Sequence, residues 1–464
     1  MNDLDTLKTQ LYPVLSSGAL IRIAGRVLLH INKEIVRHTE RTSYLVMKIA
    51  HAYKLPERGS IRNLVFLSLF HTIGFFREDM FFNYSPYSND IDYLSDTLEV
   101  KSKYMFGCFY LEFMTPIKDD AMALDDFNSG YNKDIKNYLY QETYKSIINL
   151  CARVSDFVNR YPDKPLPDDL NDLAPGKLDP EVIGIFSGLN KNHELEDCIR
   201  DEGYLEELYD FINKMQFSEE DNKTLEKLLI YLLDFKSTVT MSHSINTSCY
   251  ALALGLRKDL TSEQLSKLFT SAVLHDIGKI VTPQRILEYP GKLSPEDMGI
   301  MRYHVNHSKR ILKGLVPEEI LDNVFRHHEK LNGSGYPQHL TASELNLTQR
   351  ILTIADITSA LCDSRSYKGK FSKEKVLSIM REMTDKRELD GELMNILENE
   401  FDIIHEEMPV LQSFMRVDFS KVIGKYNEYI LHLSSPTAAS GDLDDIEEPE
   451  DLEELETLED LEEL

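Results

Sequence analysis

The stretch TSEQLSKLFTSAVLHDIGKI, at residues 261–280, decides the class of fold. Thr261 and Gln264 form the pattern of a capping box, in which each side chain bonds the other residue's backbone N–H at the start of a helix. Apolar residues then recur every three or four positions, which gives one apolar face on a helix. The pattern ends at His275 and Asp276, and Gly278 follows. We therefore expect a helix whose C-terminal end carries a histidine and an aspartate.

The same spacing runs through most of the chain, whereas alternation of period two is hard to find. Apolar stripes of this kind cover residues 20–37, 41–54, 61–72, 137–158, 222–236, 243–256, 296–313, 349–362 and 372–383. Segments rich in Gly, Pro and Asn separate them. The sequence therefore predicts an all-α fold.

The helical pattern occurs twice along the chain. RHTERTSYLVMKIAHAYKL (37–55) parallels SHSINTSCYALALGLRKDL (242–260), and FLSLFHTIG (66–74) parallels FTSAVLHDIG (269–278). Three more matches follow in order: SGY (129–131) with SGY (334–336), NLCARVSDFV (149–158) with TIADITSALC (353–362), and GKLDPEVIGIF (176–186) with RELDGELMNIL (387–397). We predict tandem copies of one helical domain, at 1–215 and 216–437, followed by a disordered acidic tail at 438–464.

The charge balance excludes some classes of partner. Of the 464 residues, 78 are Asp or Glu and 51 are Lys or Arg, so the net charge is −27. Surfaces for nucleic-acid polymers or anionic membranes are rich in Lys and Arg, so we expect neither partner. The segment 441–464 contains 14 acidic residues and no basic one. It is either a solvated tail or a short helix that docks on a basic partner.

Three further features concern the compartment. The five cysteines are scattered and form no CxxC pair, which is typical of free thiols in a reducing environment. The N-terminal segment MNDLDTLKTQ lacks the apolar run of a signal peptide. No stretch approaches the roughly 18 apolar residues of a membrane span. We expect a cytoplasmic protein.

Candidate metal ligands gather in the second copy. Seven of the 14 histidines fall between His243 and His339. On a helical period Asp276 lies beneath Phe269 and Ala272, so its carboxylate points inward, which is costly unless a cation matches it. Alternatively, Asp276 bonds a neighbouring backbone group while Gly278 caps the helix. Asp356, in RILTIADITSAL (350–361), also lies on a helix that is otherwise able to pack, so burial of its carboxylate likewise calls for a cation.

Each histidine taken alone has an ordinary explanation. His304, with His307 one turn later, suits the boundary of a core, His327 and His328 suit a surface pair, and His243 lies near the start of a helix. Taken together, imidazoles and carboxylates on four or five helices match a two-metal hydrolytic centre with one bridging and one terminal carboxylate.

These motifs resemble the HD superfamily of metal-dependent phosphohydrolases, and specifically the HD-GYP family. The resemblance covers roughly residues 225–400. It rests on HDIGKI (275–280), HHEKLNGSGYP (327–337), RILTIADITSAL (350–361) and SRSYK (364–368), in the family's order and with similar spacing. It implies that the metal ligands are His243, His275, Asp276, His304, His327, His328 and Asp356, with Asp276 bridging.

The resemblance also implies roles in substrate binding. Lys279 would contact the reacting phosphate and take part in catalysis with Asp276. Arg365 and Lys368 would hold the substrate phosphates, a role that suits a bidentate guanidinium. Tyr336 and Tyr367 are candidates for stacking on a base, although Tyr336 alternatively shapes its loop.

The chain departs from the family pattern at several positions. Asn332 replaces the usual Asp before GSGYP, and Val305 and Ser308 replace Pro and Gly after the helical histidine. None is a ligand, so the departures concern substrate fit more than metal binding. Val239 stands where some members carry a glutamate for a third metal, so we expect two ions. The mixed imidazole and carboxylate ligands favour iron or manganese over zinc.

The first copy lacks most of this set. It keeps His38 and His71, whereas Thr72 stands for Asp276, Tyr104 for His304, and Ala152 for Asp356. The other replacements are Met122 and Ala123 for His327 and His328, and Phe75 for Lys279. Two histidines without carboxylates give a poor site for divalent cations. We predict that this copy binds no catalytic metal.

The resemblance implies a phosphodiesterase that opens a cyclic dinucleotide, with cyclic di-GMP as the first candidate, to the linear dinucleotide and in some cases on to GMP. A hybrid cyclic GMP-AMP stays open as substrate. The rival hypothesis is a signalling adaptor that binds nucleotide or protein and turns over little. A protein partner at the GYP loop or the acidic tail, and a homodimer, also stay open.

Overall fold

The computed structural model describes residues 11–55, 60–76, 94–125, 127, 140–234, 238–289, 291–363, 371–415 and 420–434. Over these residues the chain is built from helices and holds no β-strand; a single isolated bridge pairs Asn332 with Thr341. The predicted all-α class is confirmed. The acidic tail 438–464 lies outside the described residues.

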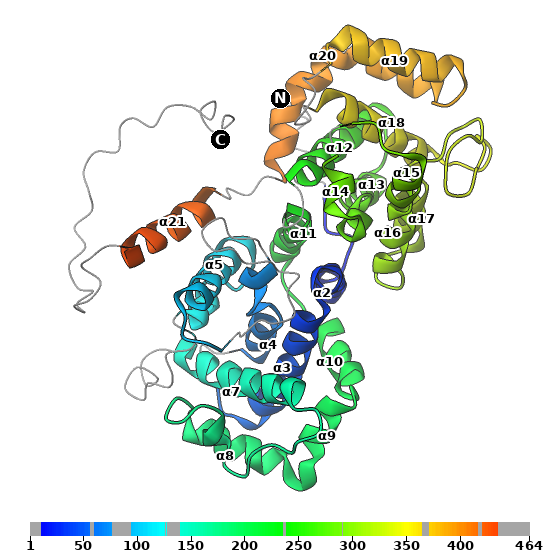
Figure 1. Ribbon diagram of the computed structural model, residues 1–464. Helices are drawn as coiled ribbons and strands as arrows, with labels where there is room; N and C mark the ends of the chain where they lie inside the picture. Colours follow the sequence, from blue (N-terminus) through cyan, green and yellow to red (C-terminus); the bar gives the residue numbers. More distant parts are fainter. Residues whose placement is uncertain are drawn as a thin grey trace, which may run out of the picture.

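The first half of the chain forms the lower group of helices in Figure 1. Its described α-helices are α2 (Ser17–Ile31), α3 (Lys33–Ala52), α4 (Ile61–Phe70), α5 (Leu98–Met114), α7 (Tyr140–Arg160), α8 (Pro180–Leu189), α9 (Glu194–Arg200) and α10 (Tyr204–Asn213). Short 3₁₀ helices join them: η1 (Ile73–Phe76), η2 (Lys118–Leu124), η3 (Leu170–Leu173) and η4 (Lys191–His193). The apolar stripe at 20–37 spans two helices, because the Asn32 side chain accepts a hydrogen bond from Ile35 N and caps α3.

The second half forms the upper group of helices in the same view (Figure 1). It comprises α11 (Glu219–Asp234), α12 (Thr238–Arg257), α13 (Ser262–Leu274), η5 (Ile277–Val281), α14 (Gln284–Leu287), α15 (Pro295–Arg302), α16 (His304–Leu312), α17 (Glu318–Arg326), α18 (Leu347–Cys362), α19 (Lys373–Asp385) and α20 (Gly391–Ser413). The predicted capping box starts α13: Thr261 Oγ1 accepts from Gln264 N, and Gln264 Oε1 accepts from Thr261 N. The stripe at 296–313 is divided at Tyr303 into α15 and α16.

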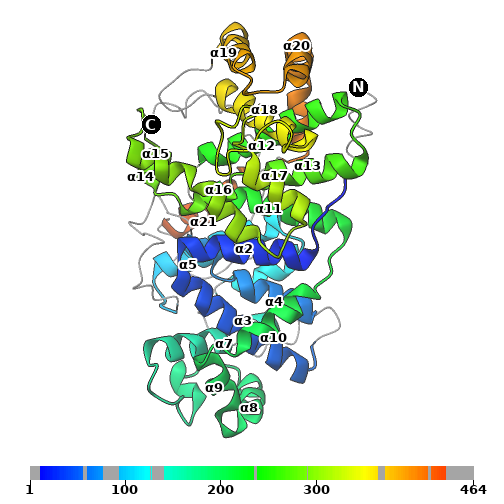
Figure 2. The same ribbon diagram turned by 90° about the vertical axis from the view of Figure 1, so that its right-hand side faces the viewer.

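Helices α2 and α21 each connect the halves. Helix α2 packs on α11 and also contacts α16 and η5 of the second half, as both ribbon views show (Figures 1 and 2). Helix α21 (Ser420–Ser434) returns to the first half and packs on α5, where the ring centroids of Phe106 and Tyr426 are 5.4 Å apart. The division into units at residue 216 stays a proposal, with α21 docked on the first unit.

The two halves repeat one close approach of backbone to backbone. A Cβ atom on Gly278 would lie 2.1 Å from His304 O and 2.4 Å from Ser308 N. A Cβ atom on Gly74 would lie 2.0 Å from Lys103 O and 3.1 Å from Gly107 N. Glycine is therefore required at both positions, because any side chain would push the following helix away. By this geometry the counterpart of His304 is Lys103, one residue before the Tyr104 that sequence spacing selects.

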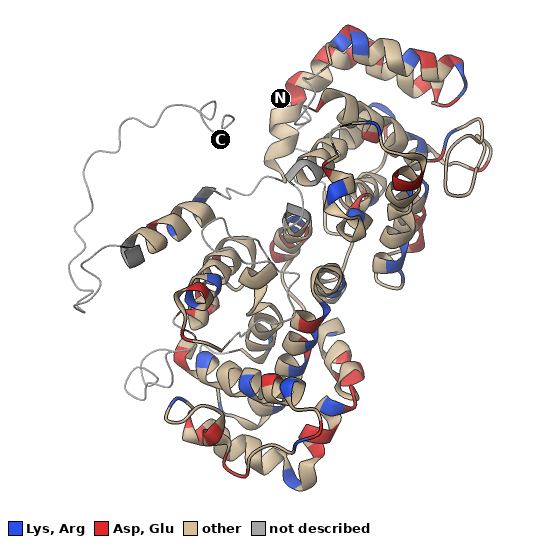
Figure 3. Ribbon diagram, in the orientation of Figure 1, with Lys and Arg blue, Asp and Glu red and all other residues tan. Residues whose placement is uncertain are grey.

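The outer surface carries both signs of charge. Lys and Arg lie among Asp and Glu over outer helices such as α19 (Figure 3). Among the described residues, no helix is both long and apolar enough to cross a bilayer.

Candidate metal centre

Five helix ends and helix faces converge on one buried cluster. His243 comes from α12, His275 and Asp276 from the junction of α13 and η5, His304 from the first residue of α16, His327 and His328 from the end of α17, and Asp356 from the middle of α18. Helices α12, α13, α17 and α18 pack against one another. Asp276 is 1% exposed and Asp356 is 6% exposed, so the two carboxylates lie in the interior.

The two oxygens of Asp276 face two different groups of histidines. Its Oδ2 atom lies 3.2 Å from His275 Nε2 and 3.6 Å from His243 Nε2. Its Oδ1 atom lies 3.3 Å from His304 Nε2 and 3.9 Å from His327 Nε2. A carboxylate with one oxygen directed to each of two ligand groups has the geometry of a bridge between two cations.

Asp356 lies on the other side of the cluster. Its Oδ1 atom is 2.9 Å from His243 Nε2 and 3.7 Å from His275 Nε2, and its Oδ2 atom is 3.4 Å from His328 Nδ1. The ligand atoms of His243, His275 and Asp276 lie within 4.8 Å of one another, and so do those of His304, His327 and His328. The cluster thus offers two adjacent places for a cation.

The backbone fixes which nitrogen of the buried histidines faces the cluster. The Nδ1 atoms of His275, His304 and His327 each lie 2.7 Å from the carbonyl oxygen three residues earlier, that of Ala272, Met301 or Val324. A carbonyl only accepts, so Nδ1 carries the proton and Nε2 presents a lone pair. This is the arrangement in which protein histidines bind metals.

Two buried atoms at the centre lack a hydrogen-bond partner: His275 Nε2 and Asp276 Oδ1. Buried polar atoms are nearly always satisfied, so this pair indicates that the site is built for another group. A divalent cation between them would satisfy both, and the mixed set of nitrogen and oxygen donors fits such an ion.

The electrostatics of the cluster also suit cations. Burial lowers the pKa of His304 to about 4 and that of His328 to about 3, so both rings are neutral. Burial raises the pKa of Asp276, but His275 and Lys279 outweigh burial and hold that pKa well below its usual range. Burial likewise lowers the pKa of His275, yet the Asp276 and Asp356 carboxylates outweigh it and raise that pKa to about 10. Without a metal, a proton on His275 supplies the positive charge that the two carboxylates require.

A serine positions the segment that carries Asp276. Ser308 Oγ accepts a hydrogen bond from Gly278 N over 2.9 Å and donates one to His275 O over 3.1 Å. The departure from the family's glycine at this position therefore adds two bonds that tie α16 to the His275–Gly278 segment. Lys279, one turn beyond Asp276, places its Nζ atom 2.5 Å from Asp276 Oδ2 with a side chain that is 21% exposed.

The GYP loop is held over the cluster by a buried glutamate. Glu329, 1% exposed, accepts hydrogen bonds from Gln338 N over 2.6 Å and from Leu340 N over 2.9 Å. Gly335 passes so near that its Cβ would lie 2.4 Å from Lys330 N. The Tyr336 ring consequently lies 4.8 Å from the His328 ring. The guanidinium of Arg302 lies 5.2 Å from the same Tyr336 ring.

Asn332 has a structural role in the same loop. Its Oδ1 atom accepts from Ser334 N over 3.0 Å, and its Nδ2 atom donates to Lys386 O over 3.0 Å. An aspartate could not donate the second bond. The departure from the family pattern is thus matched by a contact with the turn after α19.

The structure therefore places seven predicted ligands, Lys279 and Tyr336 around one centre, whereas Arg365, Lys368 and Tyr367 lie outside the described residues. His307 is turned toward Tyr303, at a ring distance of 5.1 Å. Sequence reasoning missed Ser359 and Asp363, which lie beside His243: Ser359 Oγ is 3.0 Å from His243 Nδ1, and Asp363 Oδ2 is 3.7 Å from it. Their spacing of three and seven residues from Asp356 on one helix face could have indicated them.

The corresponding region of the first half keeps a pair of histidines but is otherwise filled by aromatic rings. His38 and His71 keep the pairing, with ring centroids 5.3 Å apart against 5.4 Å for His243 and His275. Aromatic rings fill the remaining space: the Phe127 ring lies 5.9 Å from His71 and 4.6 Å from Tyr104. Burial lowers the pKa of His71 to about 4, so this ring is neutral in an apolar surrounding.

Comparison with known proteins matches the part of the chain that forms this centre. Residues 227–393 match the HD domain family. The 3′3′-cGAMP-specific phosphodiesterase 1 of Vibrio cholerae is 31% identical over 179 residues, which are 38% of this chain and 42% of that protein. The cyclic di-GMP phosphodiesterase PA4108 of Pseudomonas aeruginosa is 30% identical over 145 residues, 31% of this chain and 35% of that protein. The matched part thus spans less than half of each of these relatives.

A solved structure extends the likeness to most of the chain. The crystal structure of a cyclic GMP-AMP specific phosphodiesterase of V. cholerae, V-cGAP3, superposes with a TM-score of 0.54 and 18% identity. The superposition covers 84% of this chain and 98% of the other, so both halves share its fold. HD-domain phosphohydrolases depend on metals, and this chain holds two groups of candidate ligands within the matched segment. Residues 227–393 therefore form an HD domain, and the HDIGK and GSGYP motifs within them support its resemblance to the HD-GYP family.

Proposed function

We propose that this protein is a metal-dependent phosphodiesterase that hydrolyses a cyclic dinucleotide at the cluster around Asp276. The observation that carries the proposal is the position of Asp276 between two groups of ligands, one of His243 and His275 and one of His304, His327 and His328. Paired divalent cations activate water and stabilise negative charge in phosphoryl transfer. The HD family match supports the same chemistry.

The chain's own residues have separate roles in this proposal. Asp276 and Asp356 would hold two cations together with the five histidines, and the neutral rings of His304 and His328 need lose no proton to bind. Iron or manganese suits the mixed nitrogen and oxygen donors better than zinc. Lys279, partly exposed beside Asp276, is placed to receive a phosphate oxygen of the substrate and offset its charge.

The mouth of the site offers groups for the rest of a dinucleotide. The Tyr336 ring covers His328, and Arg302 on α15 is exposed beside it. An aromatic ring and a guanidinium are suited to stack on a base and to bind a phosphate, respectively. Arg365 and Lys368 keep the phosphate-binding role that the family resemblance implies.

We propose cyclic di-GMP as the substrate and the linear dinucleotide as the first product. Relatives named for cyclic di-GMP and relatives named for 3′3′-cGAMP both match this chain, so the two substrates belong in one test. The full chain, loaded with Mn²⁺ or Fe²⁺, is incubated with each nucleotide, and the products are separated by chromatography. Cyclic di-GMP should be opened faster than cyclic GMP-AMP, and Asp276→Ala should open neither.

Asp322→Ala is a matched control, because Asp322 lies on the surface of α17 and pairs only with Arg326 among the described residues. It should retain turnover. Tight nucleotide binding without a linear product in wild type would favour the signalling adaptor and end the proposal of an enzyme. Faster opening of cyclic GMP-AMP would overturn the choice of substrate alone.

A further inference from the structure

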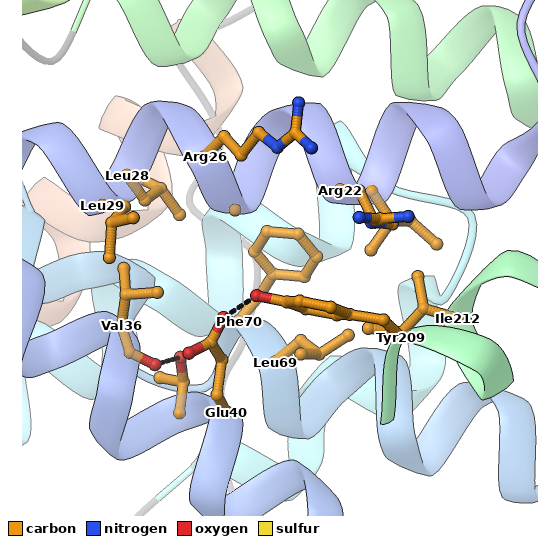
Figure 4. Close-up of a pocket in the computed structure, with 13 residues that line it drawn as sticks. Arg22, Arg26, Leu28, Leu29, Val36, Glu40, Leu69, Phe70, Tyr209 and Ile212 are labelled. Atoms are coloured by element: carbon orange, nitrogen blue, oxygen red, sulfur yellow. Dashed lines mark hydrogen bonds between the residues drawn. The ribbon is translucent and has the colours of Figure 1, made fainter. Parts of the chain in front are cut away.

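A cavity in the first half lies outside the metal centre and contains none of its residues. It has a volume of about 110 Å³ and is enclosed by α2, α3, α4 and α10 (Figure 4). Most of its wall is apolar, with contributions from Leu28, Val36, Phe70 and Ile212. A dry apolar cavity of about 150 Å³ binds benzene, and this cavity is smaller, so it limits the apolar body of a ligand to about one ring.

Gly25 on α2 keeps the cavity open. It lines the cavity, and a Cβ atom built on it would meet no atom within 4 Å. Glycine in the interior of a helix is less favourable than alanine, because it loses more backbone freedom on folding. No backbone contact at Gly25 requires this residue, in contrast to Gly278. Its effect in the folded protein is therefore the space that it leaves.

One side of the cavity is polar, and its carboxylate already accepts hydrogen bonds from the protein. The Glu40 carboxylate, 7% exposed, accepts hydrogen bonds from Tyr209 Oη over 2.5 Å and from Arg37 over 3.0 Å. The Arg22 guanidinium lies 4.8 Å from the centroid of the Tyr209 ring and lies above that ring in Figure 4. The cavity therefore ends at a cation and not only at apolar groups.

Arg22 brings a positive charge to this end, and Arg26 lies one helical turn away on α2. Within the described part of the chain, neither forms an ion pair with a carboxylate. Arg22 bonds the neutral Asn213 Oδ1, and Arg26 bonds backbone carbonyls. Two guanidiniums one helical turn apart repel each other, and an anion at Arg22 would relieve that repulsion.

Arg26 links the same helix to the metal centre. In Figure 4 its side chain points away from Glu40 and Tyr209. Its guanidinium donates to Ile311 O over 2.6 Å and to Lys313 O over 2.9 Å, at the end of the helix α16 that begins with His304. Helix α2 also contacts η5, which carries Lys279. A shift of α2 would therefore change its contacts with both α16 and η5.

We propose that this cavity binds a small organic carboxylate with an apolar body of about one ring, its carboxylate on Arg22, and that occupancy of the cavity steadies α2 against α16. A carboxylate suits the fork of a guanidinium, whereas a phosphate dianion would place a second negative charge beside Glu40. An effect on turnover rests on the proposed function; binding of the ligand does not.

The binding test uses the full chain and benzoate as the probe, measured by calorimetric titration with benzyl alcohol and inorganic phosphate as comparison ligands. Benzoate should bind saturably and more tightly than either. Gly25→Leu should weaken it by about tenfold or more by filling the cavity, and Arg22→Gln by about tenfold by removing the charge. Gly184→Leu is the matched control, since Gly184 is an exposed helical glycine with no atom near its Cβ position, and it should bind as wild type does.

Equal affinity for benzoate in wild type and both cavity variants, or no saturable binding by wild type, would overturn the proposal. The coupling is read by hydrogen exchange. Benzoate should slow amide exchange in α16 of wild type, and Arg26→Leu should bind benzoate without that slowing. Unchanged exchange in wild-type α16 at saturating benzoate would refute the link between the cavity and α16. Neither readout needs turnover, so failure of the proposed enzyme would leave both results interpretable.

Discussion

The Nε2 atom of His243 lies 2.9 Å from the Oδ1 atom of Asp356, although 113 residues separate them in the chain. The same nitrogen lies 3.6 Å from Asp276 Oδ2. Both carboxylates thus reach one imidazole on α12, and they are close enough to share a pair of cations.

Asp356→Asn should remove most of the bound metal and lower turnover at least about a hundredfold, because an amide cannot supply the negative charge that balances a cation. Metal per chain is measured by mass spectrometry of the purified protein, alongside the rate on cyclic di-GMP. Asp322→Asn on α17 is the matched control and should keep its metal. Full metal content in Asp356→Asn would mean that Asp356 is not a ligand.

His71→Asn should leave the metal content unchanged, whereas His275→Asn should lower it. The two histidines occupy matching places and make the same Nδ1 contact with a backbone carbonyl. Only His275 lies beside carboxylates, because aromatic rings surround His71. Loss of metal in His71→Asn, or four or more ions per wild-type chain, would show that the first half also holds a metal centre.

Gly278→Ala should destabilise the protein by several kcal/mol, about 3 or more, since its Cβ atom would lie 2.1 Å from His304 O and neither backbone can move without breaking the Ser308 bonds. Gly299→Ala, at an exposed position of α15 with no neighbouring atom, should change stability little. Urea unfolding followed by circular dichroism compares the two. A wild-type midpoint for Gly278→Ala would refute the close contact of η5 with α16.

Glu329→Gln should raise KM for the dinucleotide by about tenfold and leave metal content unchanged. The glutamine can accept only one of the two hydrogen bonds from Gln338 N and Leu340 N, and its amide group would face the other N–H. The loop that carries Tyr336 should then be less ordered. Steady-state kinetics and metal analysis separate this from a ligand role, in which both the metal and kcat would fall.

The contribution of Glu226 to the free energy of unfolding should fall as the pH rises from about 5 to 8. Burial raises the pKa of Glu226 to about 8, above its ordinary value of 4.5, so the folded protein holds a proton that the unfolded chain has lost. The loss is on the order of 3 kcal/mol or less. In urea unfolding, the stability of Glu226→Gln relative to wild type should therefore rise with pH over this range, whereas Glu220→Gln, an exposed neighbour on α11, should keep the wild-type slope. An unchanged slope in Glu226→Gln would contradict this assignment.

The parts of the site that could be predicted are those in which one helix face suffices. Asp276 and Asp356 are acids on apolar faces, and an inward acid requires a cation. The roles of Ser308 and Glu329 were not predictable in this way, because each bonds the backbone of another segment and only the crossing of those segments defines the contact. Sequence spacing also selected Tyr104 where the backbone places Lys103, since the two halves differ in loop length before α5 and α16.

The fold was predictable as a class and less so in its connections. Apolar spacing marks the helices, but the break at Asn32 depends on a side-chain cap and the break at Tyr303 on the turn between α15 and α16. The docking of α21 on α5 could not be predicted, because an apolar stripe does not specify its partner.

The return of α21 to α5 has a consequence for biosynthesis. Lys425 reaches Glu112 across 313 positions of the chain, and Tyr426 packs on Phe106. During translation, the face of α5 that packs on α21 therefore lacks this partner until the entire metal-binding half has been made. Helix α5 cannot reach its final packing until the ribosome has released residues 420–434, so α21, near the end of the described chain, completes a unit whose other helices are made first.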